Sequence, residues 1–308
     1  MGYSEKPIFG FATLVIGLSS LSGCGGGGGG GSNVIPSEPV PVVEVPTYVS
    51  PYSPIGYQQT LVKAPSLWDQ VITGAGITVA VLDSGVTAAH NEFKDLDGNS
   101  RVRLDIARSY ISDGMGNVYV DTDVTDTPLA SYHGTSVASI ALGQTTGIAP
   151  EANLLPIKIS DDGYTHLDAV QQGVRYASQY SDLINVSYSG MVNFSNVNSG
   201  SQPSEYTLAR SLFNEHHNFA LIVSAGNDGL PNGTDPFLDS TLSNLSIATE
   251  AKNRVLNVIS VDSSGVRSWF SNYPGSCADV YAADAGATSK FREIISQHHC
   301  LTTSRLRI

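Results

Sequence analysis

The sequence predicts an α/β fold in which a doubly wound, mostly parallel sheet carries helices on both faces. Three features of the sequence support this prediction. Short apolar runs of strand length alternate along the chain with stretches of helical spacing. The runs are apolar almost throughout, as expected of strands that are covered on both faces. Chemically active side chains follow two of the runs, and functional residues gather at the carboxyl ends of parallel strands.

Each expected element has its own signal in the sequence. The first strand, 77–82, is an apolar run that ends before Asp83-Ser84-Gly85. A run of small and apolar residues, 136–142, opened by His133-Gly134-Thr135, predicts a buried helix. The remaining expected elements are a strand at 154–159, a helix at 167–178, a strand at 183–187, a helix at 206–215, and strands at 220–224 and 255–261. Strand, helix and strand in repetition predict crossover connections and therefore a parallel sheet.

The N-terminal residues resemble a bacterial secretion signal followed by a flexible tether. Residues 1–24 contain an early lysine, a short apolar segment and Leu21-Ser22-Gly23-Cys24, which resembles the lipobox of bacterial lipoproteins. The resemblance implies that a lipid is attached to the thiol of Cys24. The protein is therefore expected in the cell envelope as a lipid-anchored lipoprotein, facing the periplasm or the cell surface. Residues 25–54 are rich in glycine and then in proline, which predicts a tether between the lipid and a folded domain.

Two further parts follow the tether. Residues 55–286 have the composition of a globular domain, whereas residues 287–308 are basic and lose the strand and helix pattern. Cys277 lies in the first of these parts and Cys300 in the second. An oxidising compartment would permit these two cysteines to pair, and the sequence leaves open whether they do.

The charge balance argues against one class of partner, and the acidic loops give little support for a metal site. The net charge of −12 argues against nucleic acid, because phosphate binding needs clusters of lysine and arginine. Two acidic segments, 95–99 and 121–126, have a calcium-like composition, but neither matches a complete calcium-binding loop. We therefore expect solvated loops at both places, and neither a metal nor another cofactor.

Three motifs carry the chemistry. Asp83 follows the first strand, His133 opens the buried helix, and Asn227 follows the strand 220–224. Each residue alone is also compatible with a turn or a helix cap. Together, over about residues 67–282, these motifs resemble those of the subtilisin-like serine proteases, the subtilase family (peptidase S8). In that family the catalytic residues follow one another along the chain in the order Asp, His, Ser.

The resemblance implies a role for each of these residues. His133 is the expected general base, Asp83 is expected to hold the imidazole tautomer, and the Asn227 amide is expected to donate a hydrogen bond to the oxyanion. A role in substrate binding is implied for the residues beside them, namely Ser187, Tyr188, Ser189, Ala225 and Gly226. Polypeptides are the expected substrates, and hydrolysis of the peptide bond is the expected reaction.

The serine nucleophile is the part of the motif set that the sequence does not supply. The family places this serine in Gly-Thr-Ser before small residues, and the one Gly-Thr-Ser here, 134–136, belongs to the histidine motif. Ser136 is therefore not expected to act as the nucleophile. Residues 270–273 resemble a late turn of the family, and Ser289 lies too soon after them and is followed by the bulky segment 290–292. We expect an incomplete domain that lacks its C-terminal part, including the nucleophile, from about Ala283 onward.

Three interpretations remain open at this point. The first is a lipid-anchored serine endopeptidase that is truncated before its nucleophile, with a tether that also resembles that of lipoprotein autotransporter subtilases. The second is a non-catalytic surface lipoprotein, a pseudoprotease whose cleft binds peptides. The third is a nonfunctional truncated product, because loss of a buried helix would leave a large apolar hole in the domain.

Overall fold

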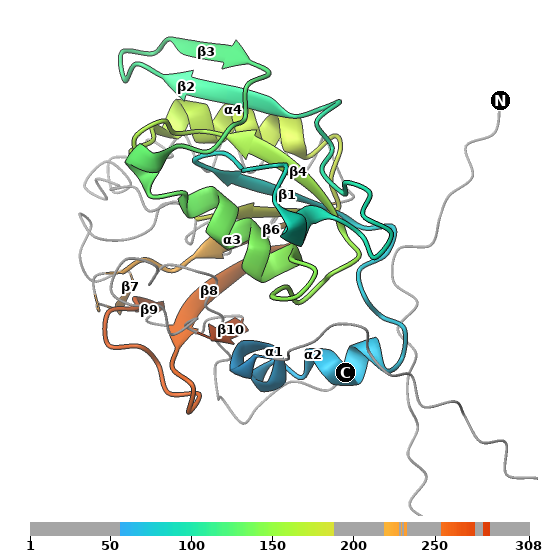
Figure 1. Ribbon diagram of the computed structural model, residues 1–308. Coiled ribbons are helices and arrows are strands. Elements are labelled where there is room, and N and C mark those ends of the chain that lie inside the picture. Colours follow the sequence, from blue (N-terminus) through green and yellow to red (C-terminus); the bar gives the residue numbers. More distant parts are fainter. Residues whose placement is uncertain are drawn as a thin grey trace, which may run out of the picture. The chain divides into compact units, whose positions relative to one another are not determined.

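The computed structural model describes residues 56–187, 219–227, 229, 231–232, 254–274 and 280–283. These residues form an eight-stranded sheet in the order β10-β8-β6-β5-β1-β4-β2-β3, with helices on both of its faces (Figure 1). The strands of this sheet are β1 (Thr78–Asp83), β2 (Arg108–Ser112), β3 (Val118–Asp121), β4 (Asn153–Lys158), β5 (Leu183–Val186), β6 (Ala220–Ser224), β8 (Val255–Val261) and β10 (Val280–Ala283). A small second sheet pairs β7 (Pro231–Asn232) with β9 (Tyr273–Pro274). The helices are α1 (Tyr57–Leu61), α2 (Ala64–Trp68), α3 (His133–Leu142) and α4 (Leu167–Ala177), with short 3-10 turns η1 (Asn91–Phe93) and η2 (Pro128–Ala130).

The large sheet is parallel apart from one edge. Every neighbouring pair of its strands runs parallel except β2 and β3, which are antiparallel. The chain adds β2, β3 and β4 on one side of β1, and then β5, β6, β8 and β10 on the other. This reversal of direction is the doubly wound topology that the sequence predicts, so the predicted fold class is confirmed. β1 lies between β4 and β5, where Leu82 is in register with Ile157 on one side and with Val186 on the other.

The alternation of side chains along β1 explains why its sequence is apolar throughout. Val79 and Val81 belong to a buried cluster that includes Val137, Ala138 and Leu142 of α3. Ala80 and Leu82 point the other way, into a cluster that includes Ala169, Val170 and Val174 of α4. Because each face of β1 is covered by a different helix, both sets of side chains are buried. The centre of the sheet is thus covered on both faces, and this packing holds the end of β1, where Asp83 lies.

The expected elements agree with the structure wherever it describes them. The predicted strand 255–261 coincides with β8 and the predicted strand 220–224 with β6. The other expected strands and helices differ from β1, α3, β4, α4 and β5 by three residues or fewer at either end. The predicted helix at 206–215 lies outside the described residues. None of the helices in the described part of the chain has the length and apolar character that crossing a bilayer requires.

Several elements were not predicted from the sequence. The β2–β3 hairpin is missing from the expected elements because it forms a half-exposed edge, and β3 is almost wholly exposed. The helices α1 and α2 are each five residues long and too short for a periodic signal. β10 pairs in parallel with β8, at the place where the family pattern was expected to end. Its partner is distant in sequence, so no local pattern marks it.

Candidate active site

A buried carboxylate and an imidazole meet at one edge of the sheet. Nδ1 of His133 lies 2.7 Å from Oδ1 of Asp83. The side chain of Asp83 is only 5% exposed and that of His133 is 19% exposed. The same Oδ1 atom accepts a hydrogen bond from the backbone N–H of Ser84, at 2.8 Å. Since an ionised carboxylate only accepts hydrogen bonds, the proton of the neutral imidazole is held on Nδ1, and the lone pair is on Nε2.

The sheet fixes the carboxylate. Asp83 is the last residue of β1 and is in register with Lys158, the last residue of β4. Its backbone carbonyl accepts a hydrogen bond from the N–H of Ile159, at 2.8 Å. The backbone is therefore still bonded to the neighbouring strand at the position where the side chain leaves the sheet, which limits the freedom of the carboxylate.

Two glycines let the helix of the histidine approach the strand of the aspartate. Gly134, the second residue of α3, packs so tightly that a Cβ atom would collide with the carbonyl oxygen of Gly85 and would lie 2.9 Å from Cβ of Asp83. Gly85 has a φ of +109°, and a Cβ there would lie 2.6 Å from the carbonyl oxygen of Val124. The glycines after Asp83-Ser84 and after His133 are thus required by the close contact of the two segments.

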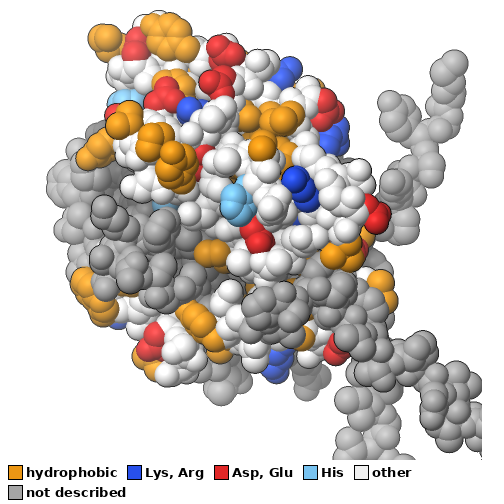
Figure 2. Space-filling model, viewed as in Figure 1, with side chains coloured by type: hydrophobic (Ala, Val, Ile, Leu, Met, Phe, Trp, Pro, Cys, Tyr) orange, Lys and Arg blue, Asp and Glu red, His pale blue; other side chains and the backbone are white. Residues whose placement is uncertain are grey.

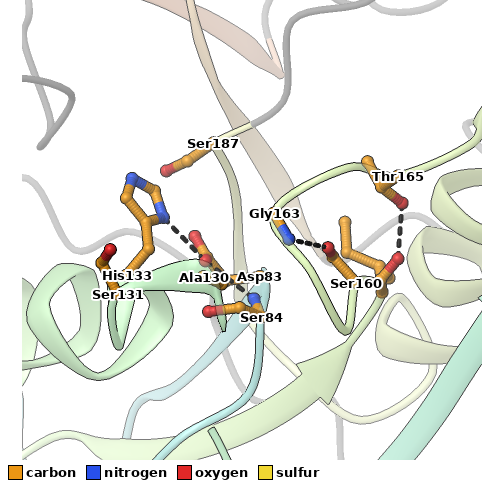
Figure 3. A pocket seen from close by; sticks show the side chains of 10 residues that line it. Asp83, Ser84, Ala130, Ser131, His133, Ser160, Gly163, Thr165 and Ser187 are labelled. Atoms are coloured by element: carbon orange, nitrogen blue, oxygen red, sulfur yellow. Dashed lines mark hydrogen bonds and ion pairs between the residues drawn. The ribbon is translucent and has the colours of Figure 1, made fainter. Parts of the chain in front are cut away.

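The pair lies in a pocket of about 230 Å³ (Figure 3). The pocket is lined by residues from four parts of the chain: Asp83, Ser84, Ala130, Ser131, His133, Ile159, Ser160, Gly163, Thr165 and Ser187. Figure 3 shows the Ser187 side chain, just beyond the end of β5, directed to the side of the His133 ring. The structure therefore brings the predicted residues Asp83, His133 and Ser187 together at one site.

The predicted oxyanion residue follows the next strand of the sheet. β1, β5 and β6 are neighbours and parallel, so Asp83 at the end of β1 and Ser187 and Asn227 after β5 and β6 lie at the same edge of the sheet. Asn227 is exposed, whereas the preceding residues Ala225 and Gly226 are buried. The turn at residues 270–272 holds this loop on both sides of Asn227. Gly226 O accepts from the N–H of Asn272 at 2.8 Å, and the N–H of Gly229 donates to the carbonyl of Phe270 at 2.7 Å.

Other expected residues divide into those that the structure places elsewhere and those that it does not describe. Ser136 belongs to α3, and its hydroxyl donates to the carbonyl of Tyr132 in the preceding turn, at 3.1 Å. That contact directs its oxygen along its own helix. The expectations for Cys24, Tyr188, Ser189, Cys277, Ser289 and Cys300 fall outside the described residues.

The two acidic loops differ from one another. In the loop 95–99, Oδ1 of Asp95 accepts hydrogen bonds from the backbone N–H groups of Asp97 and Asn99, so this carboxylate closes its own turn. The expectation of a solvated loop at 121–126 is wrong for Asp126, which is only 5% exposed because it bonds to groups from other segments. Among the residues that the structure describes, no group of three or more histidine, cysteine, aspartate or glutamate side chains is arranged to hold a metal ion.

The wall of the pocket that lies opposite His133 was not predicted from the sequence. This wall is the loop 160–165, where Ser160 Oγ accepts from the N–H of Gly163 at 2.9 Å and Thr165 Oγ1 donates to the carbonyl of Ile159 at 2.5 Å. The signal in the sequence is only a glycine within a polar stretch, which is typical of any surface turn. Its place opposite His133 follows from the register of β1 and β4, which brings Ile159 beside Asp83.

The surface near the pocket offers exposed aromatic side chains. Acidic, basic and hydrophobic groups are interspersed over the described part of the face in Figure 2. Tyr132 and Tyr164 are 48% and 82% exposed, and each is a chain neighbour of a residue that lines the pocket. Exposed aromatic side chains beside a pocket provide contact area for a larger ligand.

Comparison with known proteins places this geometry in a family. The family model described as the subtilase family, peptidase S8, matches residues 74–304. Subtilisin-like protease 1 of Pseudogymnoascus destructans is 32% identical over 221 residues, which is 70% of this chain and 45% of the relative. Subtilisin DY of Bacillus licheniformis is 29% identical over 228 residues, 71% of this chain and 68% of the relative. The chain spans about half the length of the first curated relatives that it matches.

A solved structure agrees with the fold. A protease from Pseudoalteromonas arctica superimposes with a TM-score of 0.54 at 22% identity, over 73% of this chain and 67% of that one. The family model covers most of the chain, including the strands and the helix that carry Asp83, His133 and Asn227. The chain therefore belongs to the subtilase family of serine proteases.

Proposed function

We propose that this protein is a serine-type endopeptidase that hydrolyses polypeptides. The observation that carries the proposal is the contact of 2.7 Å between Nδ1 of His133 and Oδ1 of a buried aspartate, at the edge of a pocket. A carboxylate in this position stabilises the imidazolium that forms when Nε2 takes a proton. Such a pair has the geometry of a general base and the residue that orients it.

In the proposed mechanism, each described residue acts at a stated atom. Nε2 of His133 removes the proton from the hydroxyl of a nucleophilic serine, which the family's Gly-Thr-Ser motif does not mark in this sequence, as that oxygen attacks the peptide carbonyl. His133 later returns the proton to the leaving amine, and water then cleaves the acyl-serine ester with the same imidazole as base. Asp83 holds the Nδ1 proton throughout. The side-chain amide of Asn227 donates to the oxyanion, a contribution of about 3–4 kcal/mol to stabilisation of the transition state. Ser187, Ala225 and Gly226 follow neighbouring strands, as do Tyr188 and Ser189 in sequence, and we assign them to substrate binding. We propose no cofactor and no nucleic-acid partner for this reaction.

Hydrolysis of an unfolded protein such as casein tests the proposal. Wild-type protein is expected to release peptides, and His133→Gln is expected to release none above background. His166→Gln is the matched control, because His166 is also exposed to solvent in part but lies at the start of α4, outside the pocket. Equal hydrolysis by wild type and His133→Gln would show that another enzyme in the preparation is responsible, and would remove support for the proposal.

A non-catalytic peptide-binding protein is the second candidate function. It is favoured by the sequence, in which the one Gly-Thr-Ser is 134–136, and by the hydroxyl of Ser136, which bonds to its own helix. The same pocket and the exposed Tyr132 and Tyr164 would then hold a peptide without cleaving it. Saturable peptide binding by a folded protein that releases no product would favour this candidate. A nonfunctional product is the remaining alternative, and a cooperative thermal unfolding transition would count against it.

We also propose that the protein is anchored to a membrane of the cell envelope through lipid on Cys24. The support is the lipobox-like sequence that ends at Cys24 and the tether of residues 25–54. The resemblance of this tether to that of lipoprotein autotransporter subtilases is part of the same proposal. Cys24→Ser is expected to move the protein from the membrane fraction to the soluble fraction of the expressing cells. An unchanged membrane fraction would contradict the anchor and would leave the proposed chemistry untouched.

A further inference from the structure

Asp126 is a buried carboxylate that the proposed reaction does not use. It is 5% exposed, although the aspartates before it in the same loop are exposed. Its Oδ1 accepts from Ser84 Oγ at 2.7 Å and from the N–H of Thr127 at 2.8 Å. Its Oδ2 accepts from the N–H of Thr135 at 2.8 Å and from Thr135 Oγ1 at 2.5 Å. All four partners are donors, and an ionised carboxylate has the acceptor sites for all of them.

These contacts supply the cap that α3 lacks. The residue before the helix, Tyr132, is in the left-handed region with a φ of 55° and makes no side-chain cap. Instead Ser84 Oγ accepts from the N–H of Gly134 at 3.0 Å, and Asp126 accepts from the N–H of Thr135. The first N–H groups of a helix have no partner within the helix, so Ser84 and Asp126 cap α3 from outside.

The turn that leads into α3 makes this external cap more important. Ser131 and Tyr132 are both left-handed, with φ values of 57° and 55°. Consecutive non-glycine residues in this region are strained, and such a conformation persists only where surrounding contacts hold it. His133 follows directly, so the position of its imidazole depends on contacts that fix the first turn of the helix.

The cap links the residues that directly follow Asp83 and His133 in the chain. Ser84 follows Asp83, and Gly134 follows His133, so the bond from Gly134 N to Ser84 Oγ ties the two segments together beside the imidazole contact. Asp126 orients this link, because it accepts a hydrogen bond from the Ser84 hydroxyl and so leaves the lone pairs of that oxygen free to accept from the N–H of Gly134.

We propose that Asp126 is a positioning residue that sets His133 against Asp83, acting through Ser84 and Thr135. This inference rests on the proposed function, in which that pair is the base. The contacts of Asp126 lead to the imidazole only through Ser84 and the first turn of α3. Removal of the Asp126 charge is therefore expected to change the position and tautomer of the imidazole while the domain stays folded.

The ¹⁵N spectrum of the His133 imidazole tests the inference on the full chain. Its signal is assigned by its loss in His133→Gln and is recorded with the ring neutral. Wild type is expected to show the tautomer protonated at Nδ1. Asp126→Asn keeps the size of the side chain but places an amide group against donors, so a mixture of tautomers is expected. Asp121→Asn, an exposed change of the same charge in the same loop, is expected to match wild type.

A second pair of variants covers the case in which Asp126→Asn does not fold. Thr135→Val removes the hydroxyl that donates to Asp126, and Thr135→Ser keeps it. The inference predicts mixed tautomers for Thr135→Val and recovery of the wild-type spectrum for Thr135→Ser. A wild-type spectrum for a folded Asp126→Asn, or for Thr135→Val, would overturn it.

Hydrolysis separates this inference from the proposed function. In active protein, Asp126→Asn is expected to lower kcat by roughly a hundredfold with little change in KM, since a misplacement of about 1 Å has that effect. If wild type cleaves nothing but the tautomer responds to Asp126→Asn, the proposed function fails and the inference stands. If wild type cleaves and Asp126→Asn retains both its kcat and its tautomer, the inference fails and the function stands.

Discussion

Nδ1 of His133, the first residue of α3, lies 2.7 Å from Oδ1 of Asp83, the last residue of β1. The two residues are far apart in sequence, and no single local pattern brings them together. Their contact requires the register of β1 in the sheet, a helix that starts at the same edge, and glycines where the two segments touch.

The first prediction concerns the carboxylate of the pair. Asp83→Asn presents an amide to Nδ1, which favours the wrong imidazole tautomer, and kcat is expected to fall by about ten-thousandfold in active protein. Steady-state hydrolysis of a peptide substrate measures this effect. Asp97→Asn, an exposed change of the same kind in another loop, is the control and is expected to leave kcat unchanged. A loss of less than tenfold for Asp83→Asn would contradict the role assigned to Asp83.

The second prediction concerns the contact between helix and strand. Gly134→Ala places a methyl group against the carbonyl of Gly85 and the side chain of Asp83. The helix must move to make room, so the free energy of unfolding is expected to fall by about 1–3 kcal/mol and hydrolysis to fall with it. Urea unfolding and peptide hydrolysis give the two quantities. Ser136→Ala on the same helix removes only a hydroxyl bonded to Tyr132 and is expected to change neither.

The third prediction concerns the pH dependence of stability. Burial raises the pKa of Glu92, but hydrogen bonds from the N–H and hydroxyl groups of Thr145 and Thr146 outweigh it, so that the pKa is lowered overall. A lowered pKa in the folded state contributes stability above the pKa of the unfolded chain. That contribution is lost as the pH falls through the folded pKa.

Glu92→Gln tests the predicted direction of this pH dependence. At neutral pH the variant is expected to be less stable than wild type by about 1 kcal/mol, a figure reduced for the partial exposure of the group. At about pH 3, below the ordinary glutamate pKa of 4.5, the difference is expected to shrink, because wild type has by then lost part of the same contribution. Urea unfolding at the two pH values measures it. A difference that stays constant or grows on acidification would show that Glu92 does not act through its charge.

The fourth prediction concerns Arg101, which is 7% exposed. Its guanidinium donates to the backbone carbonyls of Ala152, Leu142 and Glu92, at 2.6, 2.7 and 2.8 Å. It therefore joins the end of α3 to the segment that enters β4. Arg101→Met leaves these carbonyls without a charged donor and is expected to lower the free energy of unfolding by about 3 kcal/mol or more.

Arg103→Met is the matched control for Arg101. Arg103 pairs with Asp105 at the surface, where the two side chains are 41% and 60% exposed. Solvent screens such a pair, so this variant is expected to unfold at the same urea concentration as wild type. Equal destabilisation by the two variants would mean that loss of positive charge, rather than loss of the buried hydrogen bonds, controls stability.

The central strands could be predicted from the sequence, because a buried strand has an apolar sequence of its own. β1 is an apolar run because both of its faces are buried, and β6 and β8 are also largely apolar. Asp83 could be placed because a charged residue directly after such a run must lie at a strand end. The β2–β3 hairpin is half exposed and has no comparable apolar run, so the sequence does not predict it.

The role of Asp126 could not be obtained from the sequence for a different reason. Among the aspartates of 121–126 nothing local sets it apart, and composition alone indicated a solvated loop. Its burial depends on Ser84 and Thr135, which come from other segments and are brought together only by the fold. The loop 160–165, which faces His133 across the pocket, escaped prediction for the same reason.

Labelling with a fluorophosphonate probe tests the central claim, that this chain is a serine endopeptidase, most directly. The probe loses fluoride and bonds to a serine oxygen that is activated by a neighbouring base, and peptide mass spectrometry identifies the labelled residue. The claim requires a serine nucleophile that the family's Gly-Thr-Ser motif does not mark in this sequence, so we predict one labelled serine in the folded wild-type chain and no label in His133→Gln. Absence of label from wild-type protein that unfolds cooperatively, or equal labelling of wild type and His133→Gln, would contradict the claim.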